Sequence, residues 1–173
     1  MTTTSPAHTL GPRAELDYYD VRALALPMPI TALQAWNLVT AEPQPLLQVA
    51  FGIRDTISAL FGVKRIGGFS GTQRDTIKPG DRLDFFLVEH CASDMLVLTE
   101  RDRHLDVMIC IAIAEQVLTI TSSVITHNAF GRLYMLPVGP AHKVIINSDF
   151  KRLKRRLDAM ATGSATLPPA GDR

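Results

Sequence analysis

The sequence predicts an α+β fold in which a curved antiparallel sheet wraps around a long C-terminal helix, with two short helices after the first strand. One observation is a series of four apolar stretches joined by short polar turns: Leu83–His90, Met95–Arg101, His104–Ala114 and Val117–His127. Another is an amphipathic helical pattern that follows them and ends near Met160. A meander closed by one helix must cover the apolar face of that helix, so the two parts should enclose the core.

The N-terminal part supplies the remaining elements. Tyr18–Leu26 is rich in β-forming residues and bounded by prolines, which predicts a first strand at an edge or closing position of the sheet. Thr31 is a suitable cap for a helix that runs to about Thr40. Helical spacing of apolar residues between Pro43 and Gly62 predicts the second short helix.

The C-terminal helix is expected to begin at a proline. Pro137 and Pro140 predict a break after the last strand, and Pro140 suits the first turn of a helix. Beyond it, six residues recur at three- and four-residue intervals and should share the face that contacts the sheet: His142, Ile146, Phe150, Leu153, Leu157 and Met160.

The chain has the length and composition of one folded domain. It has 173 residues, of which 46% are hydrophobic and 20% charged, enough apolar material for a single core. We expect the domain to span residues 16–160, with disordered tails at 1–15 and 161–173. For Lys64–Thr76, a strand and a long loop both remain open.

Composition also excludes several classes of function. A formal charge of +1 gives no general attraction to nucleic acid, and the basic run Lys151–Arg156 fits cations near a helix C-terminus. No apolar run is long enough to span a membrane and no signal peptide is visible, so a cytoplasmic location is expected. Cys91 and Cys110 fit no metal pattern and are expected to be reduced thiols. No cofactor is indicated.

Polar residues of the meander are predicted to gather at one end of the sheet. Two-residue turns at Asp102-Arg103 and Glu115-Gln116 would set the register of three strands. Thr99 would then lie beside Asp106, Met108 beside Ser123, and His104 beside His127, with Asp84 opposite Arg101. The predicted cluster consists of Asp84, Arg101, His104, Asp106 and His127.

This cluster has a chemical and a structural interpretation. His104 could act as an acid or base with Asp106 orienting it, since a carboxylate fixes the tautomer of a nearby imidazole. No metal site is expected. The structural interpretation is a solvent-exposed face, because the opposite face of the same strands is aliphatic. The soft row Met108, Cys110 and Ala112 would then be a homodimer contact or line a cavity.

The junction between the last strand and the terminal helix carries further candidates. Arg132 and Tyr134 could stabilise developing negative charge in a reaction, or Arg132 could simply pair with a surface carboxylate. Trp36 and His142 could line a ligand site, or they could simply pack in the core. The candidate ligand-binding residues are Trp36, His127, Asn128 and His142.

Two short motifs carry a resemblance to a known group of proteins. Asp102-Arg-His104-Leu-Asp106, and Asn128 with Gly131-Arg132-Leu-Tyr134 leading to Pro140-Ala-His142, look like a bacterial family of unknown function placed in the START-like (SRPBCC) superfamily. The order of elements is similar to the helix-grip fold of that superfamily. The resemblance implies a hydrophobic cavity. It does not imply one activity, because members of the superfamily range from lipid and hormone carriers to polyketide cyclases and activators of chaperones.

Three functions follow as hypotheses. The first is binding of a small hydrophobic molecule, with aromatic and polyketide-like compounds among the candidates, between the sheet and the terminal helix. The second is a cofactor-independent cyclase, dehydratase or isomerase that acts in the same cavity, with His104, Asp106, Arg132 and Tyr134 as its catalytic residues. The third is a protein-interaction module that forms a homodimer.

Overall fold

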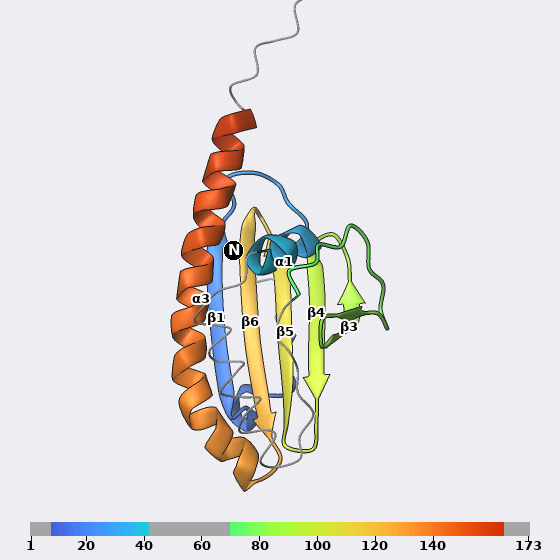
Figure 1. Cartoon of the computed structure of the whole chain (residues 1–173), viewed down its shortest axis with the longest axis vertical. Coiled ribbons are helices and arrows are strands. Elements are labelled where there is room, and N and C mark those ends of the chain that lie inside the picture. Colours follow the sequence, from blue (N-terminus) through green and yellow to red (C-terminus); the bar gives the residue numbers. More distant parts are fainter. Residues whose placement is uncertain (1–7, 42–69, 165–173) are drawn as a thin grey trace, which may run out of the picture.

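The structure is a computed structural model that describes residues 8–41 and 70–164 (Figure 1). Strands β1 to β6 form one antiparallel sheet in the order β1-β6-β5-β4-β3-β2. The elements are η1 (Arg13–Glu15), β1 (Tyr18–Ala25), α1 (Ala32–Thr40), β2 (Arg82–Leu83), β3 (Phe86–Cys91), β4 (Met95–Arg101), β5 (Leu105–Ala114), β6 (Val117–Thr126) and α3 (Ala129–Ser164). The expected α+β class, with a curved antiparallel sheet and a long C-terminal helix, is confirmed.

The first strand and the first short helix lie where the sequence predicts them. β1 is an edge strand that pairs with β6, from Tyr18 opposite Val124 to Ala25 opposite Val117. Thr31 caps α1 in a capping box: its hydroxyl accepts from the backbone N–H of Gln34, and the Gln34 side chain accepts from the Thr31 N–H. The second short helix predicted between residues 43 and 62 lies outside the described residues.

The β5–β6 hairpin has the predicted register. Glu115 and Gln116 have φ values of 50° and 61°, as a two-residue turn with both central residues in the left-handed region requires. Ala114 therefore pairs with Val117, and Met108 lies opposite Ser123 as expected.

The β4–β5 hairpin differs from the prediction by two residues. Arg101 pairs with Asp106 rather than with His104, and Thr99 pairs with Met108 rather than with Asp106. The loop is wider because the Asp102 carboxylate accepts hydrogen bonds from the backbone N–H groups of His104 (2.6 Å) and Leu105 (2.9 Å). A shift of two residues leaves each side chain on its predicted face.

The first predicted strand of the meander is divided. Asp84 has a φ of 54° and lies in a tight turn between β2 and β3, so it is not opposite Arg101. The pairing of β3 with β4 then shifts at an irregularity between Val88 and His90. Together, the turn and the shift place Glu89, instead of Asp84, beside Arg101.

The sheet has an inner face, which we define as the side covered by α1 and α3, and an outer face on the opposite side. Its aliphatic side chains point inward, as predicted: Leu96, Leu98, Ile111, Leu118 and Ile120 form the core with Trp36 of α1 and with Leu153 and Leu157 of α3. Side chains on the outer face include Thr99, Asp106, Met108, Cys110 and Ser123.

Helix α3 begins earlier and ends later than predicted. It extends from Ala129 to Ser164 and contains Pro137 and Pro140, so the predicted start at Pro140 is wrong. The two prolines remove the hydrogen bonds to the carbonyl groups of Leu133 and Leu136. Both leucines are exposed, so water can satisfy these carbonyl groups, and the helix is visibly bent at this end (Figure 1).

The buried stripe of α3 is also displaced from the predicted one. Four residues at four-residue intervals are buried: Ile145, Asp149, Leu153 and Leu157. Met160, predicted to lie on the same face, is 46% exposed, and Ile146 and His142 are half-buried. The first half of α3 passes beside β1, where Gly139 lies against the ring of Tyr18.

An N-terminal segment, residues 8–16, lies on the outer face of the sheet. The backbone N–H of Leu10 donates to the hydroxyl of Ser123 (3.2 Å), and its side chain packs against the group that contains Met108 and Cys110. The Arg13 guanidinium lies 4.6 Å from the centre of the Tyr19 ring. Part of the expected N-terminal tail thus covers the soft row for which the sequence predicts a homodimer contact or a cavity.

The described part of the chain contains no helix with both the length and the apolar character needed to cross a membrane.

Candidate functional site

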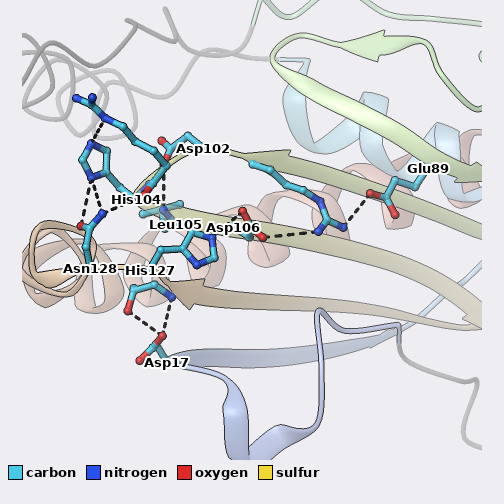
Figure 2. A network of polar contacts seen from close by, with 11 residues as sticks. Asp17, Glu89, Asp102, His104, Leu105, Asp106, His127 and Asn128 are labelled. Carbon is cyan, nitrogen blue, oxygen red and sulfur yellow. Dashed lines mark hydrogen bonds and ion pairs between the residues drawn. The ribbon is translucent and has the colours of Figure 1, made fainter.

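His104 is held by a clamp between the β4–β5 loop and the start of α3 (Figure 2). Nδ1 of His104 lies 3.2 Å from Oδ1 of Asn128, and Nε of Arg103 donates to Nε2 of His104 at 2.9 Å. Asn128 also donates to the Arg103 carbonyl oxygen (2.9 Å) and accepts from the N–H of Gly131 (3.1 Å). Both ring nitrogens of His104 therefore have protein partners.

Asp106 belongs to a second group of side chains on the outer face. Oδ1 of Asp106 lies 3.1 Å from Nε2 of His127, and Oδ2 lies 3.6 Å from Arg101, which also contacts Glu89 at 3.2 Å. We call Glu89, Arg101, Asp106 and His127 the outer ladder (Figure 2). The expected pairing of Asp106 with His104 is replaced by pairing with His127.

The outer ladder is open to solvent, and its Glu89, Arg101 and Asp106 alternate in charge. The side chain of Arg101 is 53% exposed and that of His127 is 40% exposed, so water screens these ion pairs and each contributes little to stability. Within the described residues, no three histidine, cysteine or acidic side chains are grouped to hold a metal ion. The arrangement fits a solvated structural network better than a reaction centre.

The remaining catalytic candidates, Arg132 and Tyr134, lie at the strand–helix junction. Arg132 is exposed and Tyr134 is half-buried, both in the first turns of α3. The pKa of Asp17 is lowered mainly by a hydrogen bond from the backbone N–H of Thr126, with smaller contributions from the Thr126 hydroxyl and from the charge of Arg132. The charge of Arg132 therefore reaches the surface carboxylate of Asp17.

Trp36 lies in the core. It is 4% exposed, and its ring meets that of Phe86 edge to face, with the centroids 5.9 Å apart. Its place in the cluster formed by α1, α3 and the sheet agrees with the packing role of a buried tryptophan.

His142 is part of a polar group that the sequence does not single out. Nδ1 of His142 lies 3.1 Å from the hydroxyl of Tyr18, and the two rings meet edge to face at 5.5 Å. Two residues further along β1, Arg22 binds Asp20 through Nε to Oδ2 at 2.9 Å and Nη2 to Oδ1 at 3.1 Å. We call Tyr18, Asp20, Arg22 and His142 the inner cluster.

Cross-strand pairing places the inner cluster on the inner face of the sheet. Val107 pairs with Val124, which pairs with Tyr18; Ile109 pairs with Ser122, which pairs with Asp20. Side chains paired in this way lie on the same face, so the apolar row of β5 continues into polar residues on β1. Predicting this cluster would have required the register of β1 on β6, because alternate residues of β1 point to opposite faces.

Burial shifts the titration of both aromatic residues in the inner cluster. Loss of contact with water, together with the nearby charge of Asp20, raises the pKa of Tyr18 to about 12. Burial also lowers the pKa of His142, because it disfavours the charged imidazolium, whereas Asp20 acts in the opposite direction. Both side chains are therefore neutral near pH 7.

The comparisons with known proteins concern the family of the chain and not its activity. No curated protein and no solved structure matches it. A family model described as "Protein of unknown function (DUF2867)" matches residues 13–149, which includes both quoted motifs. The expectation of an uncharacterised family is confirmed, and the chain belongs to the DUF2867 family.

Proposed function

We propose that this protein binds a small, largely hydrophobic molecule on the inner face of the sheet, beside the first half of α3. The carrying observation is that Val107 and Ile109 remain partly exposed although they lie on the inner face of a central strand. A closed core would bury such positions fully, as it buries Ile111 on the same strand at 1% exposure. Accessible apolar surface at the centre of a sheet is suited to an apolar ligand.

The inner cluster supports the same location. Ligand sites combine apolar walls with a few well-placed polar groups that orient the ligand. Here Val107 and Ile109 supply apolar surface, and Tyr18 and His142 supply polar atoms at the β1 side of the same face. The elements that meet there are β1, β5, β6 and α3, which come from both ends of the chain.

A START-like (helix-grip) assignment is part of this proposal. The order of a first strand, a helical region, a meander and a long terminal helix supports it. In that superfamily the ligand lies between the sheet and the last helix, which is where the inner cluster lies. Aromatic and polyketide-like molecules are the first candidates, because their flat apolar rings suit a surface of aliphatic side chains.

Binding without turnover is favoured over catalysis at the predicted residues. The ring nitrogens of His104 are engaged by Arg103 and Asn128, and Asp106 is engaged by His127 and Arg101. If the protein is instead a cyclase, dehydratase or isomerase, its acid and base are expected in the inner cluster, since the Tyr18–His142 hydrogen bond lies on the ligand side of the sheet.

Native mass spectrometry of gently purified protein, followed by solvent extraction, tests the proposal. We expect a stoichiometric apolar adduct on the wild type. Ile109→Trp should lose it, because the larger side chain occupies the accessible surface, and Val107→Phe is a milder second variant. The matched control is Val21→Trp, on the outer face of β1 and 46% exposed, which should retain the adduct. An adduct-free wild type that also fails to bind the neutral dye Nile red contradicts the proposal.

A further inference from the structure

The hydrogen bond between Tyr18 and His142 has a preferred direction. A phenol hydroxyl is a good donor and a poor acceptor, whereas the unprotonated nitrogen of a neutral imidazole is a good acceptor. The Tyr18 hydroxyl therefore donates a hydrogen bond to Nδ1 of His142, across the 3.1 Å separation. A neutral imidazole carries one N–H, which is then at Nε2.

Nε2 of His142 is available to another molecule. The described residues provide no hydrogen-bond partner for it, and among them no fully buried side-chain nitrogen or oxygen lacks a partner. Nε2 is thus reachable from solvent on a side chain that is otherwise half-buried. It presents a single N–H donor next to Tyr18, whose row on the inner face continues through Val124 to the partly exposed Val107.

The inner cluster offers no uncompensated positive charge to a ligand. The guanidinium of Arg22 is bound through two nitrogens by the carboxylate of Asp20, whose side chain is 11% exposed. Burial keeps His142 in its uncharged form, as the lowered pKa indicates. A carboxylate placed here would lose its hydration and would meet Asp20 rather than a free cation.

We infer that the ligand presents a neutral hydrogen-bond acceptor, such as a ketone or ester carbonyl oxygen, to Nε2 of His142, and that carboxylic acids are disfavoured. This rests on the proposed binding to the inner face. It adds the chemical class of the polar group, which the apolar surface alone does not specify.

Three probes of nearly equal shape separate these possibilities: 2-acetylnaphthalene, 2-ethylnaphthalene and 2-naphthoic acid at neutral pH. Isothermal titration calorimetry with the full chain gives their dissociation constants. We expect the ketone to bind about fivefold more tightly than the hydrocarbon, as one neutral hydrogen bond allows. The carboxylate should bind about tenfold or more weakly than the ketone, because its charge must be desolvated.

Two variants assign the difference to His142. His142→Phe retains an aromatic ring against Tyr18 and should equalise the affinities of ketone and hydrocarbon. The matched control is His90→Phe, at an exposed histidine of β3, which should leave the ratio unchanged. Tyr18→Phe removes the group that fixes the tautomer and should reduce the preference for the ketone without abolishing binding of the hydrocarbon.

The outcomes distinguish the inference from the proposed function. Equal affinities of ketone and hydrocarbon in the wild type, or tightest binding of the carboxylate, overturn the inference and leave binding to the inner face intact. A ketone preference that survives His142→Phe also overturns it. If none of the three probes binds, the proposed function fails for aromatic ligands, and the inference fails with it.

Discussion

At the scale of single residues, two histidines in this protein lie in opposite environments. His127 is on the outer face, 40% exposed and in contact with the carboxylate of Asp106. His142 is half-buried on the inner face and shares a hydrogen bond with the neutral hydroxyl of Tyr18. His142 lies on the face that carries the proposed ligand surface, so its protonation should affect both stability and ligand binding.

The burial of His142 predicts a dependence of stability on pH. Burial lowers its pKa below the usual value of 6.5, so the unfolded chain binds a proton at this residue at a higher pH than the folded chain does. The free energy of unfolding should therefore decrease as the pH falls below about 6.5, and this part of the dependence should be absent in His142→Phe.

Urea unfolding of both proteins between about pH 7.5 and about pH 5 measures the effect. The difference between the two stability profiles reports on His142 alone. It removes the contribution of Asp149, whose pKa burial raises instead of lowering. Parallel profiles for wild type and variant would contradict the prediction.

At the candidate site, the residue pattern predicts which side chains share a face but not which atoms they contact. The sequence predicts correctly that His104 lies near His127 and that Asp106 lies on the same face, since alternate residues of a strand share a face. It does not predict their contacts. The carboxylate of Asp102 binds two backbone N–H groups and shapes the loop, and His104 then meets Asn128. Such a choice among loop conformations depends on three-dimensional contacts.

At the scale of elements, α3 depends on close approach at its first turns. Gly131 lies against the backbone of His104, and a Cβ at this position would overlap the His104 carbonyl oxygen. A Cβ at Gly139, two turns later, would lie 3.5 Å from the Tyr18 ring, which is an ordinary contact distance. Gly131 and Gly139, although in one helix, therefore have different requirements.

Alanine substitutions at these glycines should have opposite effects. Gly131→Ala should destabilise the protein by about 2 kcal/mol, because the backbone of the β4–β5 loop must move. Gly139→Ala should be neutral or stabilise by up to about 1 kcal/mol, because alanine favours helix more than glycine does. Thermal unfolding monitored by circular dichroism compares the two. A loss at Gly139→Ala equal to that at Gly131→Ala would show that packing at residue 131 is not the cause.

Some elements were predictable from the sequence and others were not. The β5–β6 hairpin follows from alternation on both sides of a two-residue turn, and α1 follows from its capping residues. The continuation of α3 through Pro137 and Pro140 does not follow, since prolines usually end a helix; here the residues that lose hydrogen bonds, Leu133 and Leu136, are exposed to solvent. The irregularity that places Glu89 beside Arg101 leaves no signal in the apolar pattern.

At the scale of the whole molecule, the N-terminal segment adds a partial cover to the outer face. Leu10 packs against the group formed by Val97, Met108, Cys110 and Ala112, all of which are buried. This segment thus leaves little apolar surface exposed at the middle of the outer face, in contrast to the partly exposed Val107 and Ile109 on the inner face. Because the chain itself covers this part of the outer face, the structure favours a homodimer contact there less than the sequence alone does.

Replacing Leu10 should uncover this part of the outer face. We expect Leu10→Asp to lower the free energy of unfolding by about 1 to 2 kcal/mol, because apolar contact is lost and a charge is placed beside Met108. Cys110, a free thiol that is 1% exposed, should then react faster with Ellman's reagent. A Cys91→Ser background restricts the signal to the buried thiol.

The reaction rate and the solution mass together decide this prediction. An unchanged rate for Cys110 would show that Leu10 does not shield it. If the variant becomes a dimer at high concentration while the wild type remains a monomer, the uncovered face is capable of self-association, which is the third hypothesis raised by the sequence.

The pairing of β1 with β6 has a consequence for synthesis of the protein in the cell. A nascent chain emerges from the ribosome with Tyr18–Ala25 first, but the strand that pairs with it ends only at Thr126. The inner cluster also needs His142, from later still. Contacts of such long sequence separation form slowly, so β1 stays without its partner strand until residues up to Thr126 have been synthesised. The surface that we propose for the ligand is therefore completed only after residue 142 has been synthesised.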